Sequence, residues 1–327
     1  MSVEPLPVTR VAAVKAAAHP GHRWLVQDLW AEEAVGCIGG TPKSCKTWLA
    51  LELSVAVATG RHALGRFPVR PSSSAPVLLY AAEDSPVAVR DRVAGIAKAR
   101  DTDLDRLPLG LITVDGLRLD LPVHRERLAA TLTKVRPRLL VLDPLIRLHR
   151  GDENSSAEIS ELLGWLRTQQ REHHTAIMLV HHVRKSAAGQ PGQSLRGSGD
   201  LHAWGDSNLY LLRNQGRLVL HAEHRSNPSP PPFGIELAGE PPRLVLQGPV
   251  EVDRGDLADR VLAALAAQPL TRTELRDRLQ IRNETLGTVL AQLEADQRLL
   301  RVDGRLAVPV PALRDQRERN ATPPRRA

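Results

Sequence analysis

Short apolar runs alternate with helical patterns over the first three quarters of the chain. Runs of four or five largely apolar residues without polar alternation are typical of strands buried on both faces, as in a parallel sheet. The runs lie at residues 34–38, 77–81, 109–113, 139–142 and 176–180. The patterns between them predict helices at 47–59, 86–99, 124–135 and 156–171. This alternation indicates an α/β class with a mostly parallel sheet.

The pattern changes after residue 205. Further apolar runs separated by turns predict antiparallel strands that extend the sheet. They lie at 208–212, 218–222, 233–237 and 243–246. We therefore expect one large α/β domain over residues 34–248. The preceding segment, 1–33, carries Trp24 and Trp30, which we expect to anchor it to the core.

Residues 255–310 predict a separate small domain. They hold three helical segments, the second opened by the capping-box pattern from Thr271 to Glu274, and then a β-hairpin around Asp303-Gly304. Three helices and a hairpin are typical of a winged helix. Its arginines are balanced by acidic residues, so DNA binding and protein docking or oligomerisation both stay open. We expect residues 311–327, rich in arginine and without an apolar pattern, to be a disordered basic tail.

Charge and composition indicate which kinds of binding partner and which compartment to expect. The formal net charge of +7 favours acidic partners such as nucleotides and nucleic acid. Two cysteines make no disulfide framework, and Cys37 is expected to be buried in a core strand. The sequence begins without a signal-peptide pattern, and no apolar stretch approaches the roughly 20 residues of a membrane span. We therefore expect a cytoplasmic protein with no membrane partner.

A phosphate-binding motif follows the first predicted strand. It reads Gly40, Thr41, Pro42, Lys43, Ser44, Cys45, Lys46, Thr47, and Trp48 opens the next helix. Loops of this type wrap phosphates with backbone N–H groups, while Lys46 reaches the β- and γ-phosphates and Thr47 ligates Mg²⁺. Cys45 stands where the pattern has its second glycine. If that residue needs a positive φ, its Cβ is strained; if it is already helical, a small thiol fits. A polar turn before a buried helix is the alternative.

Two acidic residues follow neighbouring strands. Asp143 ends the run Leu139-Leu140-Val141-Leu142, as the Mg²⁺-binding aspartate of P-loop ATPases does. Glu83 follows the run at 77–81 and is our candidate for the base that polarises the attacking water. The alternative for Glu83 and Asp84 is capping of the helix at Pro86, which suits Asp84 better.

The strand at 176–180 runs into His181 and His182. Consecutive strand residues face opposite ways, so one of them is expected to point at the site and contact the γ-phosphate. A metal site there is less favoured, because no further ligands follow at zinc spacing.

In order and spacing, these motifs resemble the RecA/DnaB-type P-loop ATPases, and within them the RepA-like hexameric helicase group, over roughly residues 20–247. The resemblance implies nucleotide contacts by Lys46 and Thr47, metal binding by Asp143, a catalytic role for Glu83, and phosphate sensing by His182 or His181. It also implies ATP and Mg²⁺ as ligands.

The same resemblance implies contacts outside the nucleotide site. Arg184, Lys185 and Arg196 match a loop that touches single-stranded DNA in the ring's channel. Arg225 matches an arginine that enters a neighbouring subunit's site, which implies a homo-oligomer such as a hexameric ring. Glu223 departs from the lysine that related helicases often carry there.

We therefore expect an ATPase coupled to DNA, such as a RepA-like replicative helicase, that prefers single strands to duplex. The alternative is a nucleotide-switched regulator that binds DNA or a partner and has little motor activity. A kinase is a weaker third interpretation, since no lid or acceptor pocket stands out.

Overall fold

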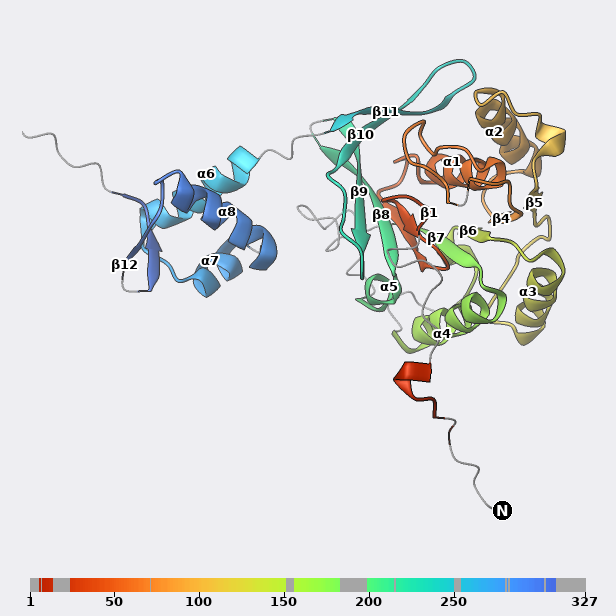
Figure 1. The fold of residues 1–327 in the computed structure, drawn as a ribbon, viewed down its shortest axis with the longest axis horizontal. Helices are drawn as coiled ribbons and strands as arrows, with labels where there is room; N and C mark the ends of the chain where they lie inside the picture. Colours follow the sequence, from red (N-terminus) through yellow and green to blue (C-terminus); the bar gives the residue numbers. More distant parts are fainter. Residues whose placement is uncertain are drawn as a thin grey trace, which may run out of the picture. The chain divides into compact units, whose positions relative to one another are not determined.

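The computed structural model describes residues 6, 8–13, 24–70, 72–150, 156–182, 199–214, 216–249, 254–279, 281, 283–302 and 304–309. The chain divides into two compact units, Met1–Val250 and Glu251–Ala327. Figure 1 shows the first as a sheet flanked by helices. None of the helices in these described ranges is long and apolar enough to span a bilayer.

The first unit is built on a nine-stranded sheet in the order β11-β10-β9-β8-β3-β7-β6-β4-β5. Its parallel part consists of β3 (Val35–Gly40), β4 (Val77–Ala81), β5 (Leu109–Leu111), β6 (Leu139–Asp143), β7 (Ala176–His182) and β8 (Ser207–Asn214). Antiparallel pairing then adds β9 (Arg217–His224), β10 (Phe233–Ala238) and β11 (Arg243–Pro249). The predicted α/β class, with a mostly parallel sheet and an antiparallel extension, is confirmed.

Helices cover both faces of this sheet (Figure 1). They are α1 (Lys46–Thr59), α2 (Pro86–Lys98), α3 (Pro122–Val135), α4 (Ser156–His173) and the short α5 (Gly199–Trp204). Side chains of β6 alternate between two apolar clusters: Leu139 and Val141 face one, Leu140 and Leu142 the other. Burial on both faces explains the uninterrupted apolar runs of the parallel strands.

Short elements complete this unit. They are the 3₁₀ turns η1 (Val11–Ala13), η2 (Leu104–Arg106) and η3 (Leu145–Arg147), and the two-stranded sheet of β1 (Trp24–Val26) and β2 (Trp30–Ala31). Trp30 is fully buried, and its indole N–H donates to the Ala34 carbonyl at 3.2 Å. The expected anchoring of the N-terminal segment through Trp30 is confirmed.

The second unit holds α6 (Arg254–Ala267), α7 (Arg272–Leu279), α8 (Asn283–Ala295), β12 (Leu300–Val302) and β13 (Arg305–Ala307). Its helices and hairpin enclose their own apolar cluster, which includes Val261, Leu275 and Leu306. The predicted capping box is present: the backbone N–H of Thr271 donates to the Glu274 carboxylate at 2.7 Å, and the Glu274 N–H donates to the Thr271 hydroxyl at 3.2 Å. The winged-helix assignment stays a prediction, and the tail at 311–327 lies outside the described residues.

Candidate nucleotide site

The phosphate-binding motif forms the loop between β3 and α1. Gly40 ends β3 in a crowded position, where an added Cβ would lie 2.6 Å from the Ser44 hydroxyl oxygen and 2.7 Å from the Leu211 carbonyl oxygen. Lys43 and Cys45 both have left-handed backbones, with φ of 60° and 62°. The loop is thus tightly curled, with α1 beginning directly after Cys45.

Cys45 has the backbone that glycine favours. Its φ of 62° and ψ of 26° settle the question left open by the sequence, because the residue is not yet helical. An L-residue in this region costs roughly 1–2 kcal/mol relative to the right-handed conformation. Burial raises the pKa of the half-buried thiol, against the lowering effect of Arg213 and Lys46. Cys45 therefore keeps the loop shape of the glycine pattern at a cost in strain.

Lys46 is buried and folded back over the loop. Its ammonium group donates to the carbonyls of Gly40 at 2.9 Å and Thr41 at 2.8 Å. Burial lowers the pKa of Lys46 to about 8, although Asp143 and Glu83 favour its charged form. These carbonyls hold the ammonium group in place without neutralising it, so it can exchange them for an anionic ligand.

Thr47 and Asp143 meet from α1 and β6, and the Thr47 hydroxyl donates to the Asp143 carboxylate. Asp143 is only 6% exposed, and burial raises its carboxyl pKa to about 6; Asp84 and Glu83 add to the rise, while Thr47 and Lys46 oppose it. A hydroxyl and a carboxylate are the hard oxygen ligands that Mg²⁺ uses together with phosphate oxygens. The pair therefore fits Mg²⁺. No group of three His, Cys, Asp or Glu residues that could hold a metal by itself exists within the described ranges.

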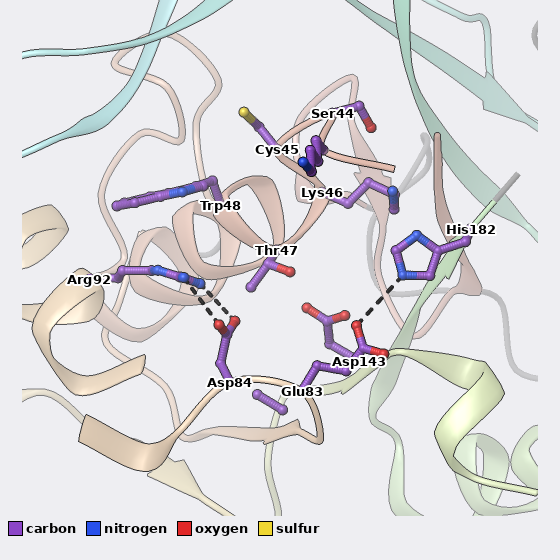
Figure 2. Close-up of a pocket in the computed structure, with 12 residues that line it drawn as sticks. Ser44, Cys45, Lys46, Thr47, Trp48, Glu83, Asp84, Arg92, Asp143 and His182 are labelled. Atoms are coloured by element: carbon purple, nitrogen blue, oxygen red, sulfur yellow. Dashed lines mark hydrogen bonds and ion pairs between the residues drawn. The ribbon is translucent and has the colours of Figure 1, made fainter. Parts of the chain in front are cut away.

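Glu83 lies two residues beyond β4, at the same edge of the sheet. Its carboxylate accepts from the Arg147 Nε–H at 3.0 Å, and its other oxygen lies 3.8 Å from His182 Nε2. Figure 2 shows Glu83 between Asp143 and His182. A carboxylate in this place can orient and deprotonate a water molecule at the end of a bound phosphate chain.

The two histidines face opposite ways, as their consecutive positions predict. His182 lines the cavity, whereas His181 is buried away from the cavity wall. Burial lowers the pKa of His181 to about 4, so that this ring is neutral at pH 7. The pKa of His182 is also lowered, by burial first and by Lys46 second. Of the two, His182 is the one that can meet a ligand.

Asp84 does not cap α2, so the structure does not support the capping role considered as the alternative for it. The cap is Ser85, whose hydroxyl accepts from the Ala88 N–H at 3.2 Å. Asp84 instead binds both terminal nitrogens of Arg92, at 2.7 and 3.1 Å. The guanidinium carbon of Arg92 lies 5.4 Å from the centre of the Trp48 ring. This planar cation forms a wall beside the loop.

A cavity of about 340 Å³ joins these groups (Figure 2). It is lined by Lys43, Ser44, Cys45, Lys46, Thr47, Trp48, Ala81, Glu83, Asp84, Arg92, Asp143 and His182. Gly40, Thr41 and Pro42 start the loop without lining the cavity. Sequence reasoning missed Arg92 and Arg147, because their contacts depend on how strands and helices pack and no motif marks them.

Arg225 follows β9 and lies near the amino end of β3, at the opposite end of that strand from the P-loop. Its backbone N–H donates to the Asp206 carbonyl at 2.9 Å, and Asp206 in turn binds Val35, the first residue of β3. Since the P-loop follows the last residue of β3, about 17 Å of strand separates Arg225 from it. Arg225 pairs with Asp206 at 3.4 Å and with the Ala203 carbonyl. Arg184, Lys185 and Arg196 lie outside the described residues.

Comparison with known families identifies the family of the chain. A family model described as an AAA domain matches residues 2–188, more than half of the chain. The chain belongs to this AAA domain family. Membership of this P-loop ATPase family implies nucleotide binding, typically together with Mg²⁺. Among solved structures, one described as the crystal structure of the RadB recombinase is similar over 63% of this chain and 88% of that chain, with 19% identity and a TM-score of 0.44.

Proposed function

We propose that the protein is a Mg²⁺-dependent ATPase that hydrolyses ATP to ADP and phosphate. The observation that carries the proposal is the convergence of Lys46, the Thr47–Asp143 pair and Glu83 on one cavity. These are an ammonium group for phosphate, oxygen ligands for a divalent cation, and a carboxylate for water. They come from the start of α1, the end of β6 and the segment after β4, all at the carboxyl ends of the parallel strands, where ligands bind in open α/β folds.

The residues divide the reaction among them. Lys46 exchanges its carbonyl partners for the β- and γ-phosphate oxygens, while Thr47 and Asp143 would hold Mg²⁺. The ion, when bound, supplies positive charge that stabilises the transferring phosphoryl group. Glu83 accepts a proton from water as the water oxygen bonds to the γ-phosphorus. The bond to the β–γ bridging oxygen breaks, and its electrons leave with ADP.

We further propose that this ATPase is coupled to nucleic acid, as a RepA-like replicative helicase or a related DNA-dependent motor. This proposal has its own basis. It rests on the resemblance to RecA/DnaB-type ATPases. Arg184, Lys185 and Arg196 would contact the phosphates of single-stranded DNA. A homo-oligomer, such as a hexameric ring, would bring Arg225 of one copy to the next copy's nucleotide. The position of Arg225, about 17 Å of strand from its own P-loop, supports a role in trans.

The test is ATP hydrolysis by the purified protein with Mg²⁺, alone and with single-stranded or duplex DNA. Lys46→Ala should lose nucleotide binding, and Glu83→Gln should keep binding but lose turnover by about 10²-fold or more. Turnover stimulated by single strands supports the helicase-type motor. Normal hydrolysis by Glu83→Gln would show that another group is the base.

A nucleotide-switched regulator is the second candidate. Two observations favour it. Glu223, where related helicases often carry lysine, is paired with His202 at 2.9 Å. Helix α8, which would enter the DNA groove in a winged helix, contains no lysine or arginine. Such a protein would bind ATP with little turnover and no preference for single strands, so the same assay separates the candidates.

A further inference from the structure

Glu83 is held in place by a cation. The Arg147 Nε–H donates to one carboxylate oxygen at 3.0 Å, and His182 Nε2 lies 3.8 Å from the other. The guanidinium occupies a carboxylate oxygen that would otherwise accept a proton from water, and the contact holds the carboxylate in one orientation. In this arrangement Glu83 is restrained from acting as a base.

The backbone that carries Arg147 is fixed. Arg147 ends η3, where its N–H donates to the Pro144 carbonyl at 3.1 Å and the Leu148 N–H donates to the Leu145 carbonyl at 2.9 Å. Leu145 and Leu148 are both buried. The Arg147 side chain, by contrast, is 61% exposed. Breaking the pair with Glu83 therefore needs only rotation of a side chain, without rearrangement of the turn.

The Arg147 guanidinium still has donors to offer. Within the described ranges Nε alone has a partner, so the terminal nitrogens face no protein acceptor there. A phosphate oxyanion can bind two guanidinium nitrogens at once, which gives it an advantage over the single Nε contact with Glu83. A phosphate arriving at this rim of the cavity would compete with Glu83 for the cation.

We propose that Arg147 is a positioning residue that restrains Glu83, and that a phosphate oxyanion binding its guanidinium releases the carboxylate for hydrolysis. This inference rests on the proposed function, since it takes Glu83 as the base. The phosphate has two sources to be separated: the backbone of a nucleic-acid strand, or the γ-phosphate of the bound nucleotide.

The experiment compares Arg147→Gln and Arg147→Lys with the full-length parent. Arg150→Gln is the matched control, because Arg150 is an exposed arginine three residues further on. Steady-state ATP turnover is measured with and without oligothymidylate, and the affinities for fluorescent ATP and ADP analogues are measured in parallel. Lysine keeps the charge and should preserve the parent's behaviour in part.

If a nucleic-acid strand is the source, Arg147→Gln raises the unstimulated kcat by about 2- to 5-fold, as expected for loss of a partly exposed ion pair, with KM unchanged. Its stimulation by oligothymidylate then falls toward none. If the γ-phosphate is the source, Arg147→Gln weakens ATP binding several-fold and leaves ADP binding as in the parent. Either result supports the restraint when kcat at saturating ATP is no lower than in the parent, because loss of a plain phosphate contact would lower kcat.

Arg147→Gln that matches Arg150→Gln in kcat, stimulation and the ATP-to-ADP affinity ratio overturns the inference. So does a fall in kcat with an unchanged stimulation ratio. Glu83→Gln in the same assay keeps the two proposals apart: retained turnover there removes the base assignment itself. A chain that hydrolyses no ATP in any arm, Arg147→Gln included, overturns both.

Discussion

The Arg92 guanidinium lies between Asp84, which binds both of its terminal nitrogens at 2.7 and 3.1 Å, and the Trp48 ring, whose centre is 5.4 Å away. This arrangement fixes a planar cation at the wall of the cavity. Lysine keeps the charge but loses the fork and the flat face. We expect Arg92→Lys to weaken ATP binding by about 3- to 10-fold, which corresponds to the net contribution of roughly one ordinary hydrogen bond.

The measurement is the equilibrium affinity for a fluorescent ATP analogue. Arg90→Lys is the matched control, because Arg90 lies on the same helix and pairs with exposed Asp91 at 3.6 Å. Equal affinities for the two variants would show that the planar cation does not contact the nucleotide.

Burial destabilises the ionised form of the Asp143 carboxyl group. Its folded-state pKa of about 6 lies above the ordinary value of 3.8, so the folded protein holds this proton more tightly than the unfolded chain. Ionisation of Asp143 therefore lowers the free energy of unfolding as pH rises from about 4 to about 6. Above about pH 6 the full cost of burying the ionised carboxylate is present. Asp143→Asn should raise the free energy of unfolding at pH 8 by about 1–3 kcal/mol.

The same variant should lose the stabilisation that Mg²⁺ with ATP gives to the parent. Thermal unfolding at pH 4 and pH 8, with and without Mg²⁺-ATP, checks both expectations, and the gain from Asp143→Asn should be absent at pH 4. Asp115→Asn, at an exposed loop position, serves as the control. An Asp143→Asn protein that is less stable than the parent at pH 8 would contradict the burial penalty.

Cys45 links the sequence motif to the loop's shape. At a φ of 62°, a glycine would remove the backbone strain of the folded state. It would also raise the conformational entropy of the unfolded chain, and these two effects on stability nearly cancel. A β-branched residue has no such relief. We expect the free energy of unfolding of Cys45→Gly to lie within about 1 kcal/mol of the parent's. That of Cys45→Val should be about 1–2 kcal/mol lower than that of Cys45→Gly. Urea unfolding measures both, and equal stabilities would mean that the loop relaxes around the side chain.

Most of the sheet could be predicted from the sequence, because burial on both faces leaves a signal in each strand. The runs at 77–81 and 139–142 correspond to β4 and β6 within one residue. Strand order leaves no such signal. β4 lies between β6 and β5, so Glu83 and Arg147 approach each other although 64 positions separate them. For that reason the motifs indicated Glu83 but not its partner.

Cys45 and Asp84 show a second limit. The motif placed Cys45 in the loop, but the sign of its φ depends on the path of the backbone between β3 and α1. Aspartate and serine are both favoured at helix N-caps. Ser85 caps α2, whereas the carboxylate of Asp84 forms a charge-assisted pair with Arg92 of the same helix. Local propensity could not decide between them.

Arg225 provides the sharpest test of assembly. Its backbone is joined through Asp206 to the start of β3, too far along the strand to reach its own P-loop. If Arg225 acts in trans, Arg225→Ala should bind ATP normally but lose turnover by about 10³-fold, the effect of an arginine finger. Mixed with Lys46→Ala, it should regain activity: an interface between a Lys46→Ala copy that supplies Arg225 and an Arg225→Ala copy that supplies Lys46 is complete.

Turnover as a function of mixing ratio measures this complementation, and the sum of the two separate variants is its baseline. Activity should peak at intermediate ratios, because only mixed assemblies contain complete sites. A control mixture of Lys46→Ala with Glu83→Gln should show no peak, since both variants damage the same copy's side of the site. Activity that never exceeds the baseline for Arg225→Ala with Lys46→Ala would place Arg225 outside the reaction and leave its pair with Asp206 as a structural contact.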